Sequence, residues 1–322
     1  MKNRFANPYV LLSLTALFWS GNMVVGRGVT ESVPPIALAF WRWSLALALI
    51  LPFALPHLRT QWPALKASWR LIVVLGILSV GGYNTFAYIA LQYTTATNAT
   101  MLNSFIPVAT IALAFVFLGK RLRPIEGLGV LVSLLGVFTI VGKGSIDTFL
   151  GLSLNRGDLW MLVAVLTWGL YTVGLQWRPQ GVHPMLLLAA LTVVGIIALA
   201  PFYAHELHGG RHMTLSPATA LALLYVAVFP SFLGYVFYNA GIAAVGPSRG
   251  AVFIHLMPVF GTLLAVVFIQ GFLIEGLRFL GDWRNLLFGA LIAVLFLKEP
   301  LRPARVVAAL MIVCGLVLIR LA

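Results

Sequence analysis

Long runs of hydrophobic residues, separated by short polar segments, follow one another along the whole chain of 322 residues. Most of these runs reach the length of about 20 residues that an α-helix needs to cross a hydrocarbon core of roughly 30 Å. The pattern therefore predicts an all-α polytopic membrane protein. Ten transmembrane helices are expected, over residues 8–28, 35–56, 70–92, 97–118, 124–142, 158–178, 183–203, 217–244, 248–269 and 303–321.

Tryptophan and proline positions of the first five predicted helices return in the second five. The repeated landmarks are Trp19, Pro35 and Pro52 in the first half, and Trp168, Pro184 and Pro201 in the second half, at an offset of 149 residues. Pro107 and Pro258 continue the match at an offset of 151. Because each unit has an odd number of crossings, the second must lie upside down relative to the first. Such a 5+5 inverted repeat is typical of secondary transporters, whose site lies near the membrane midplane.

The second repeat contains an insertion that the first lacks. Pro107 and Pro124 are 17 positions apart, whereas Pro258 and Pro303 are 45 apart. We predict a first repeat over residues 1–143, an inter-repeat loop over 144–157 and a second repeat over 158–322, with an inserted segment at about 266–294 before the last helix. This segment is expected to lie in the membrane interface as an amphipathic helix. An additional crossing through it would instead invert the last helix, so its path stays open.

Composition excludes a soluble domain, because 61% of the residues are hydrophobic and 9% are charged, against about 25% charged in soluble domains. The net charge of +13 does not indicate nucleic acid, since Lys and Arg are scattered between apolar runs as membrane anchors are. We expect a lipid bilayer and a small-molecule substrate as partners, no cofactor and a functional monomer. The single cysteine, Cys314, cannot form an internal disulfide.

The basic residues also predict the orientation of the chain. In the first half, the side of the N-terminus carries Lys2, Arg4, Arg59, Lys66, Arg70, Lys120, Arg121 and Arg123. The opposite side carries only Arg27, Lys143 and Arg156. By the positive-inside rule the N-terminus is cytoplasmic, and the first apolar run is interpreted as an uncleaved transmembrane helix. The second half, taken alone, does not follow this rule.

Several short stretches resemble a known family. They are ALFWSGNMVVGR (residues 16–27), PPIALAFWRW (34–43) and LGKRLRP (118–124) in the first half, and LTWGLY (166–171) and FLKEPLRP (296–303) in the second. With them the chain resembles the EamA-type half of the drug/metabolite transporter superfamily, twice over. Among its members, the chain is most similar to the YddG-type exporters of aromatic amino acids. The resemblance implies a bacterial inner-membrane protein with both termini cytoplasmic and a central cavity lined by both halves.

Arg42 lies well inside the second predicted helix, and its counterpart in the second repeat is Leu191. A guanidinium at this depth needs a partner, and its planar fork matches a carboxylate. Arg42 either binds a substrate carboxylate or is a structural cation bonded to backbone carbonyls. The resemblance favours the first interpretation.

Aromatic side chains with polar tips, together with polar residues near the prolines, are predicted to line a substrate cavity. Equivalent faces of equivalent helices would offer stacking surfaces and hydrogen-bonding groups to one ligand. Alternatively, these aromatic residues form interfacial belts and packing surfaces. The predicted substrate-binding residues are Trp19, Asn22, Arg42, Tyr83, Asn84, Tyr88, Asn103, Trp168, Tyr171, Tyr235, Tyr238 and His255.

Asn103 and His255 each lie shortly before a repeated proline, Pro107 or Pro258. Each side chain either satisfies backbone groups that the proline frees or faces the pathway. His255 is also the candidate for proton coupling, because histidine titrates near neutral pH.

The acidic residues argue against ion coupling. They are Glu31, Glu126, Asp147, Asp158, Glu206, Glu275, Asp282 and Glu299, and outside the insertion none lies at the centre of a predicted helix. Proton-coupled carriers commonly rely on ionisable groups inside the membrane. Export without ion coupling is therefore the first hypothesis.

Residues 203–212 bring three histidines close together, at positions 205, 208 and 212. This spacing suits metal binding on a helix, but Gly209 and Gly210 interrupt a helix there. A solvated loop and no metal site are expected.

The sequence thus predicts a secondary transporter, not an enzyme, and no catalytic residue. It would export small metabolites by alternating access, and aromatic or large neutral amino acids are the expected class. A carrier of nucleotide sugars or lipids on the same fold is one alternative. A membrane-embedded transferase or hydrolase is another, although the scattered carboxylates do not form the convergent groups that such an enzyme needs.

Overall fold

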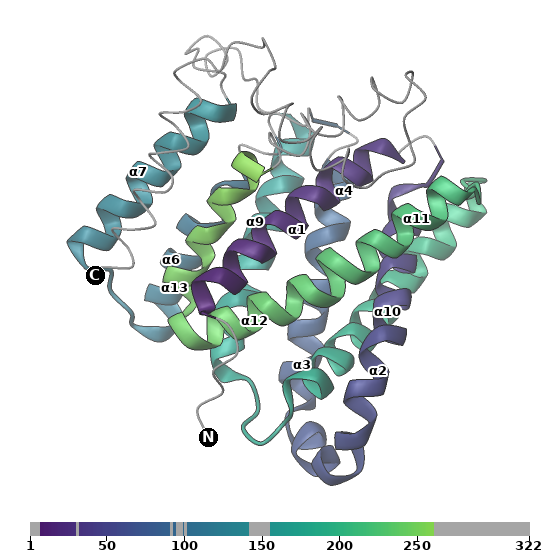
Figure 1. The fold of residues 1–322 in the computed structure, drawn as a ribbon, viewed down its shortest axis with the longest axis horizontal. Helices are drawn as coiled ribbons and strands as arrows, with labels where there is room; N and C mark the ends of the chain where they lie inside the picture. The colour runs from purple at the N-terminus through teal and green to yellow at the C-terminus, as the bar shows by residue number, and fades with distance from the viewer. Residues whose placement is uncertain are drawn as a thin grey trace, which may run out of the picture.

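The computed structural model describes residues 7–29, 32–90, 93–94, 99, 102–141 and 155–260 (Figure 1). All regular elements within these residues are helical, with no strand. The predicted insertion at about 266–294, the last predicted helix at 303–321 and residues 144–154 of the inter-repeat loop lie outside the described residues.

The first half begins at a helix whose start is fixed by Asn7, which accepts a hydrogen bond from the Tyr9 amide, and by Pro8 in the first turn, where a missing N–H costs nothing. A short connection, residues 119–123, begins where Gly119 ends a helix with φ +63°, a conformation that glycine tolerates. The elements are α1 (Pro8–Gly28), α2 (Pro35–Ala67), α3 (Trp69–Gly76), the π-helix η1 (Ile77–Tyr83), α4 (Asn84–Ala90), α6 (Ile106–Leu118) and α7 (Pro124–Val141).

The second half begins at a capping box, in which the Asn155 side chain binds the Asp158 amide and the Asp158 carboxylate binds the Asn155 amide. This arrangement satisfies N–H groups that a helix start leaves unpaired. The elements are α9 (Arg156–Gly174), the 3₁₀ turn η2 (Leu175–Trp177), α10 (Pro184–His208), α11 (Pro217–Val226), the π-helix η3 (Ala227–Leu233), α12 (Gly234–Val245), α13 (Pro247–Ala251) and the 3₁₀ turn η4 (Val252–His255).

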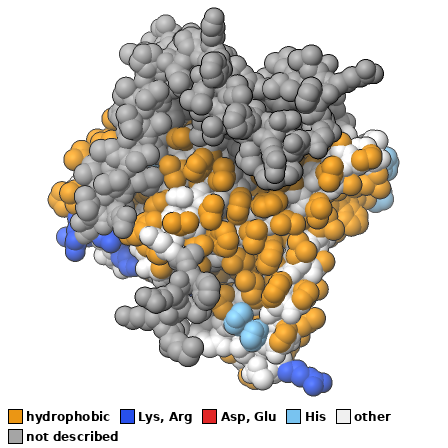
Figure 2. Space-filling model, viewed as in Figure 1, with side chains coloured by type: hydrophobic (Ala, Val, Ile, Leu, Met, Phe, Trp, Pro, Cys, Tyr) orange, Lys and Arg blue, Asp and Glu red, His pale blue; other side chains and the backbone are white. Residues whose placement is uncertain are grey.

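Five continuous helical segments among the described residues are long and apolar enough to cross a membrane. They are Pro35–Ala67, Trp69–Ala90, Arg156–Trp177, Pro184–His208 and Pro217–Val245. Figure 2 shows hydrophobic side chains over the middle of one face, along α1, α11 and α12, with the visible Lys and Arg side chains toward the lower margin. Leu215 and Leu221 are 74% and 68% exposed, which is expected where a surface contacts lipid.

Two predicted helix ends were wrong. Helix α2 continues through Pro52, Pro56 and Pro63 to Ala67. All three prolines are exposed, and each removes one intrahelical hydrogen bond without ending the helix. At 33 residues, α2 is about 50 Å long and therefore longer than the hydrocarbon core. Helix α10 likewise continues to His208 and ends at Gly209, so residues 203–208 are helical and not a loop.

The two halves pack on each other in a symmetric pattern. Helices α2 and α10 lie side by side, and each also contacts the π-helix of the opposite half: α10 contacts η1, and α2 contacts η3. Helix α1 lies along α12 in the same way that α9 lies along α4 (Figure 1). Within the described residues the repeat seen in the sequence is therefore a repeat of packing.

Both spanning segments at equivalent positions contain a π-helical stretch of seven residues, η1 and η3, offset by 150 positions. In η3 the stretch contains Pro230, whose ring removes one backbone donor; in η1 it contains Gly81 and Gly82. Stretches of this kind often occur at functional sites. Here they position Tyr83 and Asn84 in one half and Ser231 and Tyr235 in the other.

Candidate functional site

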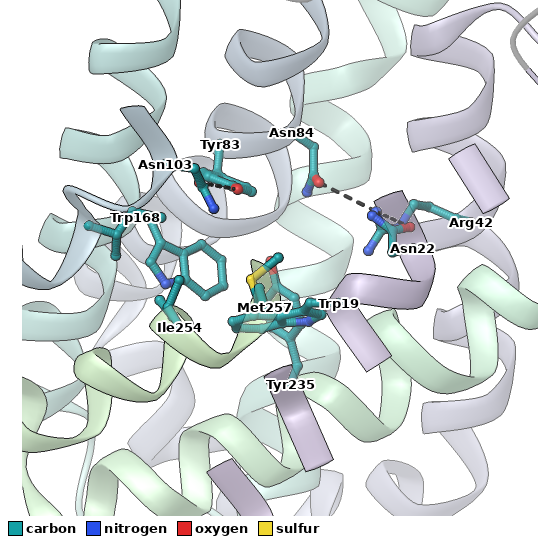
Figure 3. A pocket seen from close by; sticks show the side chains of 11 residues that line it. Trp19, Asn22, Arg42, Tyr83, Asn84, Asn103, Trp168, Tyr235, Ile254 and Met257 are labelled. Atoms are coloured by element: carbon teal, nitrogen blue, oxygen red, sulfur yellow. Dashed lines mark hydrogen bonds between the residues drawn. The ribbon is translucent and has the colours of Figure 1, made fainter. Parts of the chain in front are cut away.

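A cavity lies between the two halves, at the level of the π-helices (Figure 3). It is lined by Trp19, Asn22, Arg42, Tyr83, Asn84, Asn103, Ile106, Trp168, Tyr235, Ile254 and Met257. Its volume is about 30 Å³, room for only a few water molecules. Arg42, Asn22 and Asn84 gather at one end, and Trp168 and Ile254 lie at the other with Tyr83 and Asn103 beside them (Figure 3). The cavity therefore has a polar end that carries the charge of Arg42 and an aromatic end.

Arg42 dominates the polar end and is 2% exposed. Its Nε donates to Ser231 Oγ over 2.8 Å, and its Nη1 lies 3.3 Å from Asn22 Oδ1 and 3.4 Å from both Asn84 Oδ1 and the Tyr88 hydroxyl. The guanidinium carbon also lies 5.4 Å from the centre of the Trp43 ring, a cation–π distance. These partners come from both halves, and all of them are neutral.

No carboxylate among the described residues compensates the charge of Arg42. The one ion pair found there joins Arg249 Nε to Glu126 Oε1 over 2.7 Å, between α13 and the start of α7. Asp158 binds the Asn155 amide, and Glu206 binds the Ile36 and Ala37 amides. The described carboxylates thus serve helix N-termini, where a negative charge is favourable, and Glu31 and Asp147 lie outside the described residues.

Asn84 contributes an unused donor to the polar end. Its Oδ1 faces Arg42, which fixes the orientation of the amide, since an oxygen and not a nitrogen must accept from the guanidinium. Its Nδ2 is buried and has no hydrogen-bond acceptor in the described part of the chain. A buried amide donor without an acceptor is costly, and at the wall of a cavity it is a natural contact for a ligand.

Aromatic rings build the rest of the cavity. Trp19 and Trp168, equivalent in the two repeats, meet edge to face with centroids 5.0 Å apart at 88°. Their indole N–H groups point to other partners: Trp19 donates to the Pro230 carbonyl over 3.0 Å, and Trp168 donates to the Tyr238 hydroxyl over 3.2 Å. The indoles therefore offer ring surface and not hydrogen bonds.

Tyr83 and Asn103 are bonded to each other at the side of the cavity, with the phenol donating to Asn103 Oδ1 over 2.8 Å. Asn103 thus binds a tyrosine and lines the cavity. Nearby, Ile106 and Met257 also contribute to the lining. They immediately precede Pro107 and Pro258, so the two proline-containing segments meet at the cavity.

Some predicted substrate-binding residues lie behind the lining. Tyr88 reaches Arg42 through its hydroxyl. Tyr238 binds the Trp168 indole and Thr172, and Tyr171 donates to Asn239 Oδ1 over 2.7 Å. These tyrosines position the lining residues, and contact of any of the predicted residues with a substrate stays a prediction.

His255 is fully buried outside the cavity lining. Its Nε2 lies 2.9 Å from the Ser104 carbonyl oxygen, to which it donates, and its Nδ1 lies 2.7 Å from Ser133 Oγ. The imidazole therefore joins the segment before Pro258 to the segment before Pro107 and to α7, which is the structural use considered for it from sequence.

The sequence did not point to Ile106, Ile254, Met257 or Ser231. A signal existed for the first three, because Ile254 and Met257 are the counterparts of Asn103 and Ile106 at the repeat offset of 151. Ser231 gave no signal of its own. No group of three His, Cys, Asp or Glu side chains in the described residues is placed to hold a metal.

Comparisons with known proteins agree on the family. The model of the EamA-like transporter family matches residues 7–142 and 155–274. An uncharacterized transporter of Archaeoglobus fulgidus is 31% identical over 264 residues, covering 81% of this chain and 88% of that protein. The uncharacterized transporter YyaM of Bacillus subtilis is 28% identical over 257 residues, covering 79% and 83%. A crystal structure with 19% identity shares the fold, with a TM-score of 0.71 over 98% of this chain and 96% of that one.

Proposed function

The chain belongs to the EamA-like transporter family and is a membrane transporter, and from this premise we propose that it exports small amphipathic metabolites that carry a carboxylate. Aromatic or large neutral amino acids, as exported by the YddG-type proteins that the sequence resembles, are the first class to test. The proposed architecture is the ten-helix 5+5 inverted repeat, with the substrate held between the halves.

One observation carries the proposal: a buried guanidinium without a carboxylate partner among the described residues lies in a cavity whose other end is aromatic. Burying an uncompensated charge is expensive, and it is tolerated where a ligand supplies the opposite charge. An amphipathic carboxylate matches both ends, with its charged group at Arg42 and its apolar part against Trp168.

Alternating access supplies the mechanism, since the cavity is too small here for an amino acid and must open to admit one. The α2–α10 pair is tied at both ends: the Glu206 carboxylate binds the Ile36 and Ala37 amides at one, and Gln61 Oε1 accepts from the His183 amide at the other. We propose that this pair stays fixed while the segments around Pro107 and Pro258 rock against it.

Transport is proposed to run without ion coupling. The described carboxylates are bound at helix starts, and His255 holds three segments together. None of these groups lies free in the pathway as a proton relay would. An accumulated substrate would therefore leave down its own gradient.

The proposed setting is a bacterial inner membrane with the N-terminus in the cytoplasm and a functional monomer. The described basic residues support this orientation. On the side of the N-terminus lie Arg59, Lys66, Arg70, Lys120, Arg121, Arg123, Arg178 and Arg249. Arg27, Arg156 and Arg211 are assigned to the other side, and the excess is expected to face inward.

Reconstitution of the full chain into liposomes tests this function. Labelled phenylalanine, threonine and a nucleotide sugar would be offered in parallel, with Arg42→Ala protein as the comparison. We expect phenylalanine uptake that saturates, that depends on Arg42 and that does not change when a proton gradient is imposed. Uptake of the nucleotide sugar alone would replace the proposal with the other carrier class, and uptake driven by the proton gradient would refute the uncoupled mechanism.

A further inference from the structure

Resting on the proposed function, we infer that the cavity recognises the carboxylate of its substrate and not the amino group, so that net-anionic aromatic carboxylates bind at least as well as zwitterionic amino acids. The polar end of the cavity contains a positive charge with spare donors and no negative charge among the described residues. Its chemistry is that of an anion site and not of a zwitterion site.

The donors at the polar end exceed the acceptors. Arg42 brings the guanidinium, and the buried Nδ2 of Asn84 lacks an acceptor on the same amide whose oxygen contacts Arg42. A carboxylate placed there would accept from both side chains at once, with the geometry that favours Arg–carboxylate pairs. It would also compensate the charge of Arg42, which has no carboxylate partner among the described residues.

The acceptors near the polar end that a substrate ammonium could use are neutral oxygens, each of which already accepts a hydrogen bond. Asn22 Oδ1 and Asn84 Oδ1 accept from Arg42, and Asn103 Oδ1 accepts from Tyr83. The Pro230 carbonyl accepts from the Trp19 indole. An ammonium group would therefore lie near a guanidinium without a carboxylate to offset the repulsion between them.

The repeat supports this inference independently. Leu191, the counterpart of Arg42, is fully buried, so the second half places no opposite charge at the equivalent site. The position equivalent to Asn22 is Tyr171, whose hydroxyl donates to Asn239. Among the described residues the lining thus carries a positive charge at Arg42 and no negative charge, and the polar groups beside Trp168, which are Tyr83 and Asn103, are neutral and bonded to each other.

Binding to the purified full-length protein in detergent, followed by intrinsic tryptophan fluorescence, tests the inference with four compounds that share one ring. They are 3-phenylpropionate, L-phenylalanine, L-phenylalaninamide and phenethylamine. We expect 3-phenylpropionate to bind at least as tightly as phenylalanine. Both should bind at least about tenfold more tightly than the two cations, because the cations lack the carboxylate that forms the charge-assisted pair.

Asn84→Asp sharpens the test, because the new carboxylate would pair with Arg42 and compete with the ligand. The affinity of this variant for 3-phenylpropionate should be at least about tenfold lower than that of the parent protein. Its preference for 3-phenylpropionate over the two cations should become smaller or reverse. Asn239→Asp, an identical change behind the lining, is the matched control and should keep the order of the four compounds.

Tighter binding of phenylalanine than of 3-phenylpropionate by about tenfold would overturn the inference and leave the proposed function in place. An unchanged preference in Asn84→Asp would also overturn it. Failure of all four compounds to bind, in protein whose fold is verified by circular dichroism and which takes up none of them in liposomes, would refute the inference and the proposed aromatic substrate class together.

Discussion

Helices α2 and α10 hold equivalent places in the two halves and pack against each other, yet they differ most where they pass the cavity. Helix α2 places Arg42 there, whereas α10 places Leu191 at the same point of the repeat. Both side chains are buried. The described parts of the two halves thus share a packing pattern, and Arg42, which the second half matches with Leu191, gives the polar end of the cavity its positive charge.

The same two helices also differ at their far ends. Glu206 of α10 caps the first turn of α2, binding the Ala37 amide over 2.7 Å. Its repeat counterpart in α2 is His57, which stacks on His183, the N-cap residue of α10, with ring centroids 3.9 Å apart. A carboxylate suits a helix N-terminus at any pH at which it is ionised. An imidazole is favourable at a helix N-terminus only when it is neutral.

The largest expected effect comes from removing the positive charge of Arg42 at the cavity. Arg42→Met removes the guanidinium and keeps a long side chain, and we expect phenylalanine uptake to fall by about 10- to 100-fold, as loss of a desolvated charge-assisted pair implies. The counterpart change Leu191→Met alters little but shape and should keep uptake within about twofold. Uptake rates in liposomes at matched protein content measure the effect of each variant. Similar losses of uptake in the two variants would show that packing, and not the charge, causes the loss.

Stability of the contact between α10 and η1 gives the next effect. A methyl group added to Gly195 of α10 would overlap the side chain of Val80 in η1, so Gly195→Ala should destabilise the protein by roughly 1–3 kcal/mol. The equivalent position in α2 already holds a buried alanine, Ala46, which shows that the two packings are not identical.

Gly127→Ala in α7 is the matched control for that change, because an added methyl there meets no atom within 4 Å. It should be neutral or stabilise by up to about 1 kcal/mol through helix propensity. Thermal unfolding in detergent measures both variants, and a tolerated Gly195→Ala would show that α10 and η1 separate readily.

A smaller effect concerns the end of the pair that carries histidines. Burial, and secondarily the nearby His57, lower the pKa of His183 below its ordinary value of 6.5. Because the folded state prefers neutral His183, its contribution is fully present above about pH 6.5 and is lost as the pH falls through and below that value. His183→Asn keeps a capping side chain and should make the melting temperature less sensitive to acid between pH 8 and pH 5.

His205 supplies the control, since it is exposed near the end of α10. His205→Asn should leave the dependence of melting temperature on pH as in the parent protein. If both variants, or neither, make the melting temperature less dependent on pH, the pair of His57 and His183 does not cause the sensitivity to acid.

The smallest expected effect is on the pH profile of uptake, whose shape should not depend on His255. His255 contacts the carbonyl of Ser104, its own counterpart in the first repeat, and Ser133. We expect His255→Gln to lower the uptake rate by a similar factor at every pH, leaving the shape of the pH profile unchanged. A selective loss of pH dependence would assign proton coupling to His255 and contradict uncoupled export.

Much of the described fold could be predicted from the sequence, because apolar length and repeated prolines determine where helices lie in a bilayer. The end of α2 could not be predicted, since a proline either ends an apolar helix or is accommodated inside it at the loss of one intrahelical hydrogen bond, and the sequence alone does not decide between the two. The π-helices η1 and η3 also left no clear pattern, because an extra residue in a turn arises from packing across the two halves.

The polar groups of the cavity were predicted as residue types, but their roles depend on tertiary contacts. Arg42 stood out because a charge in an apolar helix is rare. That Ser231 and Asn84 would face it, and that one amide nitrogen of Asn84 would lack an acceptor, follows only from the crossing of α2, η3 and α4. That Tyr171 and Tyr238 lie behind the cavity lining also depends on tertiary contacts.

A structure of the full chain with phenylalanine bound tests the central claim most directly. The ligand carboxylate is predicted to lie within hydrogen-bonding distance of both Arg42 and Asn84 Nδ2, with its ring against Trp168 and the cavity enlarged to hold it. Phenylalanine bound outside this cavity, or bound with its amino group toward Arg42, would contradict the claim.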